Sequence, residues 1–306
     1  MGTSASNQGP KNINSLLPPW APELEDDGCD VPDDVFSPPL EEPAAPEDTP
    51  GAPPPASDQP PEDAPAPPGP PSSSPSLSWS SPKTLLGKLA SSGRTGSAAT
   101  REIRTIGRKF VRAHGRAGAA ANASRSGRRT AINIGGVLGE IARRGVAETF
   151  RRLGLETYLG QSPRVLLAAL AEAITPTGAL AEAAIARAAA VDALVDLFKR
   201  YDVEGRGAEA LNALDSPGIA ATMQHFVAAY INGRLVNALS IKIEEEALSA
   251  QHAVRLERDI KEFVMQTVRL DFGEQDLRRL DWNSPEAAAL VDRIVYDGFR
   301  LLEVAR

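Results

Sequence analysis

Residues 100–116 read TREIRTIGRKFVRAHGR, and this stretch decides the fold class. At 100° per residue, Ile103, Ile106 and Phe110 project from one side of a helix. Five arginines project from the opposite side, within about 60° of one direction. The stretch therefore predicts an amphipathic helix whose arginine face consists of Arg101, Arg104, Arg108, Arg112 and Arg116.

The residues that follow predict a loop and then a second helix. Small residues dominate 115–127 and indicate a loop, and helical spacing returns from about 130 to 144. Each glycine in that second helix weakens it by nearly 1 kcal/mol relative to alanine. The glycines either allow close packing or leave the helix loose until a partner binds; they are Gly135, Gly136 and Gly139.

Three Ser-Pro pairs mark helix starts beyond residue 153. Ser162, Ser216 and Ser284 each place a capping hydroxyl before a proline suited to the first helical position. We expect helices near residues 163–174, 178–200, 217–247, 250–269 and 285–304, forming an α-helical bundle. The expected core residues are Leu194, Val195, Phe198, Phe226, Tyr230, Ile231, Ile260, Phe263, Val264, Ile294, Val295 and Phe299.

The N-terminal side of the chain has a different composition. Residues 1–82 hold 22 of the 26 prolines, and 14 acidic residues face a single lysine. Such a segment lacks the apolar area that would offset the entropy of ordering it, so we predict a disordered tail. Residues 83–152 reverse the charge, with 16 basic and three acidic residues, and residues 153–306 carry 16 basic and 23 acidic ones. The expected organisation is an acidic tail, a basic helical segment and a helical bundle.

The composition argues against several classes of protein. Cys29 is the only cysteine, and three histidines add little to a conventional structural metal site, so we expect neither a disulfide nor a metal. We find no apolar run long enough to span a membrane and no secretion signal. We expect a cytoplasmic protein without a cofactor.

Catalytic signatures are also missing. Nucleophile-elbow, zinc-protease and phosphate-loop motifs do not occur. Asp192, Asp196 and the run Glu244–Glu246 fit a solvated helix face, and His225 fits a half-buried structural histidine. We therefore expect a non-enzymatic protein with no catalytic residue.

The basic segment has two interpretations. Its arginines could neutralise phosphates and bind nucleic acid through the backbone, because few aromatic residues are present to stack on bases. Alternatively they pair with acidic groups, either in the tail of the same chain or in a partner protein.

The first 22 residues contain two short signals. Removal of Met1 would expose the amine of Gly2, and the pattern through Ser6 also matches N-myristoylation. Further on, residues 16–22 read LLPPWAP, an apolar cluster in a polar tail. This cluster is either a chance grouping or a linear motif whose Trp20 enters a pocket of a partner.

The order of these features resembles the QatB family, the B component of bacterial Qat anti-phage systems. The resemblance rests on the opening Met1-Gly2-Thr3-Ser4, the Leu-x-Pro-x-Trp-type element, the proline-rich linker and the segment SRSGRR at 124–129. It implies a setting with a P-loop ATPase (QatA), a QueC-like enzyme (QatC) and a TatD-like nuclease (QatD).

The resemblance further implies that a QueC-like enzyme attaches a deazaguanine-type base to the Gly2 amine. The helical region would dock partner subunits. Partner contacts are expected at Thr3, Ser4, Leu16, Leu17, Pro18, Pro19 and Trp20.

Overall fold

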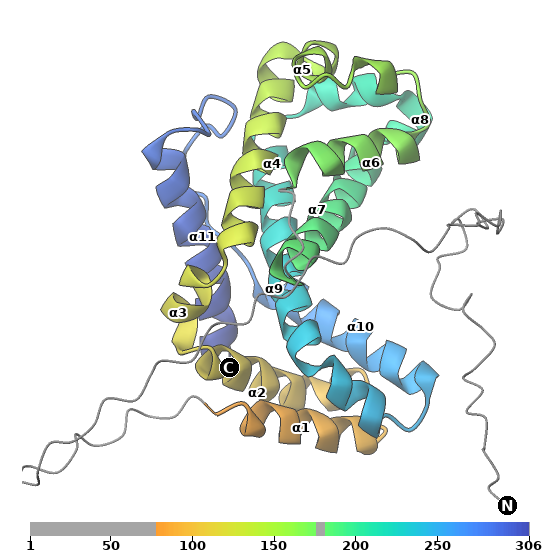
Figure 1. Ribbon diagram of the computed structural model, residues 1–306, viewed down its shortest axis with the longest axis vertical. Helices are drawn as coiled ribbons and strands as arrows, with labels where there is room; N and C mark the ends of the chain where they lie inside the picture. The colour runs from red at the N-terminus through yellow and green to blue at the C-terminus, as the bar shows by residue number, and fades with distance from the viewer. Residues whose placement is uncertain (1–77, 176–180, 306) are drawn as a thin grey trace, which may run out of the picture. The chain divides into compact units, whose positions relative to one another are not determined.

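The computed structural model describes residues 78–175 and 181–305, which all lie within one unit, Pro70–Arg306. Every regular element in these residues is a helix (Figure 1). The mostly α fold class predicted from the sequence is therefore confirmed.

Most elements follow one another with short connections, but residues 268–284 form a long loop between α10 and α11. The 3₁₀ helices are Glu156–Tyr158 and Ala208–Ala213. The α-helices are α1 (Ser80–Ser91), α2 (Ser97–Ala113), α3 (Arg116–Asn122), α4 (Arg125–Arg144), α5 (Val146–Arg152), α6 (Pro163–Ile174), α7 (Ala181–Arg200), α8 (Val203–Arg206), α9 (Ser216–Glu246), α10 (Ala250–Thr267) and α11 (Pro285–Val304).

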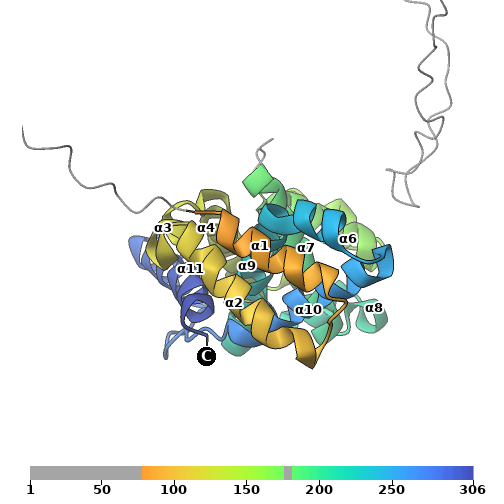
Figure 2. The ribbon, with the colours of Figure 1, turned by 90° about the horizontal axis from the view of Figure 1, so that it is seen from below.

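Helix α9 is the element around which the others pack. It contacts α1, α4, α7, α10 and α11, and it buries side chains along its whole length (Figure 1). Helices α1 and α2 lie side by side below it, as the view from below shows (Figure 2). One buried core includes residues from α1 through α11, so the change of charge at residue 152 does not interrupt the packing.

The apolar face of α2 is buried as predicted. Ile103, Ile106 and Phe110 are at most 1% exposed. They pack in the core next to α1, α10 and α11, which α2 contacts. The arginine face consequently points away from this core.

The predicted loop at 115–127 is wrong. A seven-residue helix, α3, occupies its first half, and α4 already begins at Arg125. Alanine is the strongest helix former, and Ala117, Ala120 and Ala121 are buried in the core, where α3 contacts α11. Small residues here form a closely packed helix rather than a loop.

Only one of the three predicted serine caps forms as expected. The Ser284 hydroxyl accepts a hydrogen bond from the Ala287 N–H, whereas Ser162 stands at the cap position without such a bond. At α9 the cap is Asp215, whose carboxylate accepts from the Gly218 N–H. Ser216 instead accepts a hydrogen bond from the Leu277 N–H, because the loop before α11 lies against this helix end.

The predicted core is confirmed except at two positions. Val195 on α7 and Phe263 on α10 are half-buried, and the other ten residues are buried. The exposed part of Val195 faces a groove between α6 and α7.

Candidate functional site

Four arginines of α2 form an outward-facing basic surface. Arg101 and Arg112 are exposed, and Arg104 and Arg108 are half-buried. Within the described ranges none of the four takes part in an ion pair, although the neighbouring Glu102 binds Arg94. Among the described residues these four cations therefore have no ionic partner.

Arg116 lies beyond the end of α2, although it lines a surface pocket together with Arg112. Helix α2 ends at Ala113, and Gly115 and Arg116 both adopt a positive φ that turns the chain into α3. The Arg116 Nε lies 3.1 Å from Oε1 of Glu303 on α11. Arg116 is therefore not part of the α2 helix face, because a turn ends the helical register before it, and it pairs with Glu303.

The predicted N-terminal site lies outside the described residues. This applies to the proposed modification site Gly2 and to the partner-binding residues Thr3, Ser4, Leu16, Leu17, Pro18, Pro19 and Trp20.

The glycines of α4 allow close packing, the first of the two alternatives raised by the sequence. A Cβ on Gly135 would lie 2.2 Å from the Trp282 ring, and one on Gly139 would lie 3.0 Å from its Nε1. The buried indole instead rests on this glycine face and donates a hydrogen bond to the Leu277 carbonyl. The spacing of four residues between Gly135 and Gly139 was a signal for such a contact.

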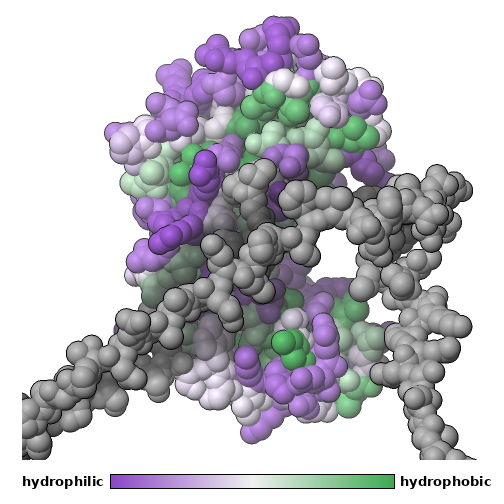
Figure 3. All heavy atoms as spheres, in the orientation of Figure 1, coloured by the Kyte–Doolittle hydropathy of each residue, from purple (hydrophilic) through white to green (hydrophobic). Residues whose placement is uncertain are grey.

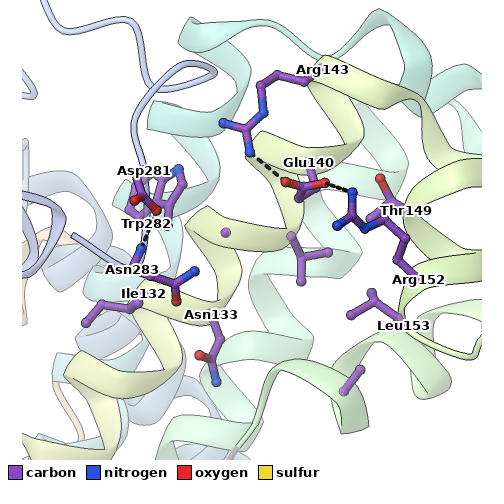
Figure 4. Close-up of a pocket in the computed structure, with 13 residues that line it drawn as sticks. Ile132, Asn133, Glu140, Arg143, Thr149, Arg152, Leu153, Asp281, Trp282 and Asn283 are labelled. Carbon is purple, nitrogen blue, oxygen red and sulfur yellow. Dashed lines mark hydrogen bonds and ion pairs between the residues drawn. The ribbon is translucent and has the colours of Figure 1, made fainter.

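A cavity of about 440 Å³ opens beside Trp282 (Figure 4). Arg143 and Arg152 point toward Glu140 from two sides. The loop before α11 lines the same cavity with Asp281, Trp282 and Asn283. The Arg143 Nη2 is 2.8 Å from Glu140 Oε1. Both arginines that line the cavity, Arg143 and Arg152, are thus ion-paired with Glu140.

The charge state of Glu140 follows from this network. Burial raises the pKa of its carboxyl, but the hydrogen bond from Arg143 and the charges of Arg143, Arg144 and Arg152 lower it more. The net pKa lies below the ordinary value, so Glu140 stays ionised at neutral pH. The cavity lining offers hydrogen-bond donors and acceptors, which suits binding of a small polar group.

A histidine joins two carboxylates where α7, α9 and α10 meet. His225 Nε2 lies 3.1 Å from Asp192, and its Nδ1 lies 3.6 Å from Asp196. Lys261 of α10 lies 3.0 Å from Asp192. The hydrogen bond with His225, helped by Lys261, lowers the pKa of Asp192 to about 2 despite its partial burial.

This cluster corrects the sequence-based interpretation of the two acids. His225 is half-buried and hydrogen-bonded as predicted. Asp192 and Asp196 are not simply exposed to solvent, because both lie within ion-pairing distance of His225. Their spacing of four residues on α7 showed that they share a face. Only the tertiary structure could bring His225 and Lys261 to that face.

A second polar cluster fastens the start of α4. Glu182 of α7 accepts hydrogen bonds from the Ser126 N–H at 2.9 Å and the Tyr230 hydroxyl at 2.8 Å. Burial, with the adjacent Glu182 carboxylate, raises the pKa of Tyr230 to about 12, which keeps the phenol protonated as a donor. Arg234 completes the cluster by donating to Ser124 and to the Tyr230 hydroxyl.

This cluster explains the segment SRSGRR at 124–129. Gly127 lies against the Tyr230 ring, where a Cβ would be 2.6 Å from the nearest carbon. Ser124 is buried and Ser126 binds Glu182 through both its backbone and its hydroxyl. The segment is therefore a helix start built around a carboxylate.

Two negative findings apply to residues 78–175 and 181–305. No group of three or more His, Cys, Asp or Glu side chains there could hold a metal ion. No helix in the same ranges has the length and apolar character needed to cross a membrane.

Comparison with protein families identifies the chain. The family model described as "QatB: Qat anti-phage system associated protein QatB" matches residues 115–302, more than half of the sequence. The chain belongs to the QatB family. QatB is described as an associated component of an anti-phage system, so the chain has a role in that defence alongside other Qat components. No curated protein and no solved structure matches it.

The QatB match separates the features described above into two groups. The Glu182 cluster, the Trp282 cavity and the His225 cluster lie inside 115–302. The four arginines of α2 and the N-terminal site lie before it. The QatB description thus applies directly to α3–α11.

Proposed function

We propose that this chain is a non-enzymatic subunit of a Qat anti-phage complex, and that a QueC-like enzyme modifies its N-terminus at Gly2. The QatB match over 115–302 supports membership of a Qat complex. The step at Gly2 rests instead on the resemblance of the opening Met1-Gly2-Thr3-Ser4 to the family. Removal of Met1 leaves a primary amine with a pKa of about 7.7–8.0, so a useful fraction is neutral and nucleophilic near pH 7.5. Chemistry at an amine on a long N-terminal segment requires no catalytic residue from the helical region.

The helical region would supply the docking surfaces. In this arrangement the helices hold the other Qat components, namely a QatC-type QueC-like enzyme, a QatA-type P-loop ATPase and a QatD-type TatD-like nuclease. Residues Thr3 and Ser4 and the element Leu16–Trp20 guide Gly2 into the QueC-like active site. An aromatic anchor near a reacting terminus is an effective way to position it.

Mass spectrometry of the intact chain tests the modification. We expect a mass increase confined to the N-terminal peptide when the chain is produced with its QueC-like enzyme, and none when it is produced alone. The variant Gly2→Val should retain Met1, because a bulky second residue blocks methionine removal, and should stay unmodified. An unmodified N-terminus in both preparations of the wild-type chain would refute the proposal.

A second candidate is binding of nucleic acid by α2. It is favoured by the four arginines on that helix, which form no ion pair among the described residues. Four phosphate contacts predict that the logarithm of the association constant falls with the logarithm of salt concentration with a slope of about −3.6.

Titration of a labelled duplex at two salt concentrations tests this candidate. Replacing the four α2 arginines by alanine should abolish salt-sensitive binding. The matched control replaces four exposed arginines elsewhere, Arg187, Arg255, Arg293 and Arg300, and should retain binding. Binding that survives loss of the α2 arginines, or that shows no salt dependence, removes the candidate.

A further inference from the structure

A pocket of about 340 Å³ lies at the C-terminal end of α2, where α3 and α11 meet that helix. Arg112 of α2, Arg116 of α3, and Tyr296 and Val304 of α11 are among the residues that line it. Figure 2 shows the three helices side by side. The pocket therefore joins the arginines of α2 to side chains from the C-terminal helix.

Close packing and a buried carboxylate hold α11 in this place. Gly107 of α2 allows the approach, because a Cβ there would lie 3.0 Å from the side chain of Leu302. The Glu303 side chain, which is 12% exposed, lies 3.1 Å from the Arg116 Nε and accepts a hydrogen bond from the Ala117 N–H. The one carboxylate in the pocket lining is thus already paired with a cation.

The lining keeps cationic and apolar groups exposed. Arg112 is exposed and forms no ion pair with any residue in 78–175 or 181–305. The Arg116 side chain is 79% exposed despite its contact with Glu303. Tyr296 is 40% exposed and Val304 is 57% exposed. A complementary ligand carries negative charge next to a flat apolar group.

The balance of charge distinguishes this pocket from the other apolar surface of the molecule. Figure 3 shows apolar surface over α6, where a groove carries basic and acidic side chains in equal number. The pocket at Tyr296 has two arginines and a single acid in its lining. Among these two surfaces, only the pocket favours an anion.

The arginines of α2 lead to this pocket. From Arg101 to Arg112 they extend over about 17 Å, because a helix rises 1.5 Å per residue. Arg112 belongs both to this row and to the pocket lining. The phosphates of a nucleic-acid strand would therefore follow the row while one base enters the pocket.

A single strand fits this arrangement better than a duplex. Proteins that bind single strands combine a basic track with aromatic side chains on which bases stack. In a duplex the neighbouring bases cover each base face, so a ring reaches it only after the base leaves the stack. The basic segment has few aromatic residues of its own, and the fold supplies Tyr296 from α11.

We propose that the four α2 arginines and the pocket at Tyr296 together bind single-stranded nucleic acid. One base stacks on Tyr296, and Arg112 and Arg116 contact the phosphates on either side of it. This inference rests on the second candidate function, binding of nucleic acid by α2, and deepens it by naming the kind of strand and the residue that holds a base.

Fluorescence anisotropy of the full chain with two labelled strands tests the proposal. One strand is an oligothymidylate of about eight nucleotides, and the other is an abasic strand with the same number of phosphates. Wild type should bind the oligothymidylate at least fivefold more tightly, since the loss of one stacked base costs at least that factor. Tyr296→Leu should remove this preference and leave the affinity for the abasic strand unchanged, whereas Tyr296→Phe should retain the preference.

Matched variants separate stacking from charge and from misfolding. Tyr158→Leu removes a ring that is 37% exposed and lies outside the pocket, and it should change neither affinity. Arg112→Ala should weaken binding of both strands by the same factor, because it removes a phosphate contact. Retained binding of the abasic strand by Tyr296→Leu shows that this variant is folded.

Equal affinity of wild type for the two strands, or a preference that survives Tyr296→Leu, would overturn the inference. Displacement of the oligothymidylate by polyglutamate as efficiently as by the unlabelled strand would indicate an acidic protein partner and would overturn it too. Salt-sensitive binding without any effect of Tyr296 contradicts the pocket alone, whereas a chain that binds neither strand nor duplex contradicts the α2 candidate as well. The two failures are therefore distinguishable.

Discussion

At the scale of single residues, glycine has opposite effects at two helical positions. The Trp282 ring lies so close to Gly135 that a Cβ there would be 2.2 Å from it. A Cβ on Gly118 of α3, in contrast, would meet no described atom within 4 Å. Helix propensity favours alanine at both by up to about 1 kcal/mol. At Gly135 packing decides the sign of the stability change on substitution by alanine. The ring lies against a buried helix and cannot move away freely.

We predict that Gly135→Ala lowers the free energy of unfolding by about 1–3 kcal/mol, because overpacking outweighs propensity. Gly118→Ala should raise it by about 0.4–1 kcal/mol. Urea unfolding followed by circular dichroism measures both. Equal stabilisation by the two substitutions would show that Trp282 does not occupy the glycine face.

At the scale of elements, a side chain from another helix supplies the cap of α4. The hydroxyl of its N-cap residue, Ser124, does not bind its first turn. The carboxylate of Glu182 accepts from the N–H groups of Ser126 and Gly127 instead, and a negative charge there also interacts favourably with the helix dipole. Formation of α4 is thereby coupled to its packing against α7.

Glu182→Ala should lower the free energy of unfolding by about 2–4 kcal/mol. The change removes a cap and leaves the buried Tyr230 hydroxyl without its acceptor. Glu182→Gln keeps one acceptor oxygen and should cost less. Glu172→Ala, at an exposed position of α6, is the control and should change the same quantity by less than about 0.5 kcal/mol. A cost at Glu182 as small as that control would contradict the capping role.

At the scale of the whole molecule, the His225 cluster ties together three of the longest helices. Asp192 of α7 binds His225 of α9 and Lys261 of α10, and its pKa is lowered from 3.8 to about 2. A carboxyl whose pKa is lower in the folded state stabilises that state above its unfolded pKa. This contribution is lost as the pH falls from about 4 toward 2.

We therefore compare the unfolding free energy of wild type with that of Asp192→Asn at two pH values. We predict that the advantage of wild type is larger at pH 6 than at pH 2.5 by about 1 kcal/mol. The figure allows for solvent screening, because a third of the side chain is exposed. Lys261→Met should reduce the difference without removing it. Parallel pH profiles for wild type and Asp192→Asn would contradict the role of this carboxylate.

The fold was largely predictable because helix signals are local. The amphipathic pattern around Phe110 and the prolines at 163 and 285 predicted α2, α6 and α11 from neighbouring residues alone. Short alanine-rich segments such as α3 were not predictable. Their composition suits a loop or a helix equally, and contact with α11 decides between them.

The candidate sites were less predictable than the fold. Four of the five predicted arginines share an outward face, since that face depends only on helical periodicity within α2. The fifth, Arg116, lies outside the helix because a turn at Gly115 interrupts the register, although it still lines a pocket with Arg112. The partners of Glu182, His225 and Trp282 come from distant parts of the sequence, so no local pattern could reveal them.

The sequence by itself determined the helical class, the approximate bounds of the five longer helices beyond residue 153 and the resemblance to QatB, because periodicity, prolines and motif order are properties of adjacent residues. It did not predict α8 or the two 3₁₀ helices. Tertiary structure alone decided which charges meet, why glycines face Tyr230 and Trp282 on α4 and where an apolar groove stays open. Those outcomes depend on distances between helices that are far apart along the chain. Burial then fixes the partners, since a buried carboxylate or indole must find a complementary group wherever the fold places one.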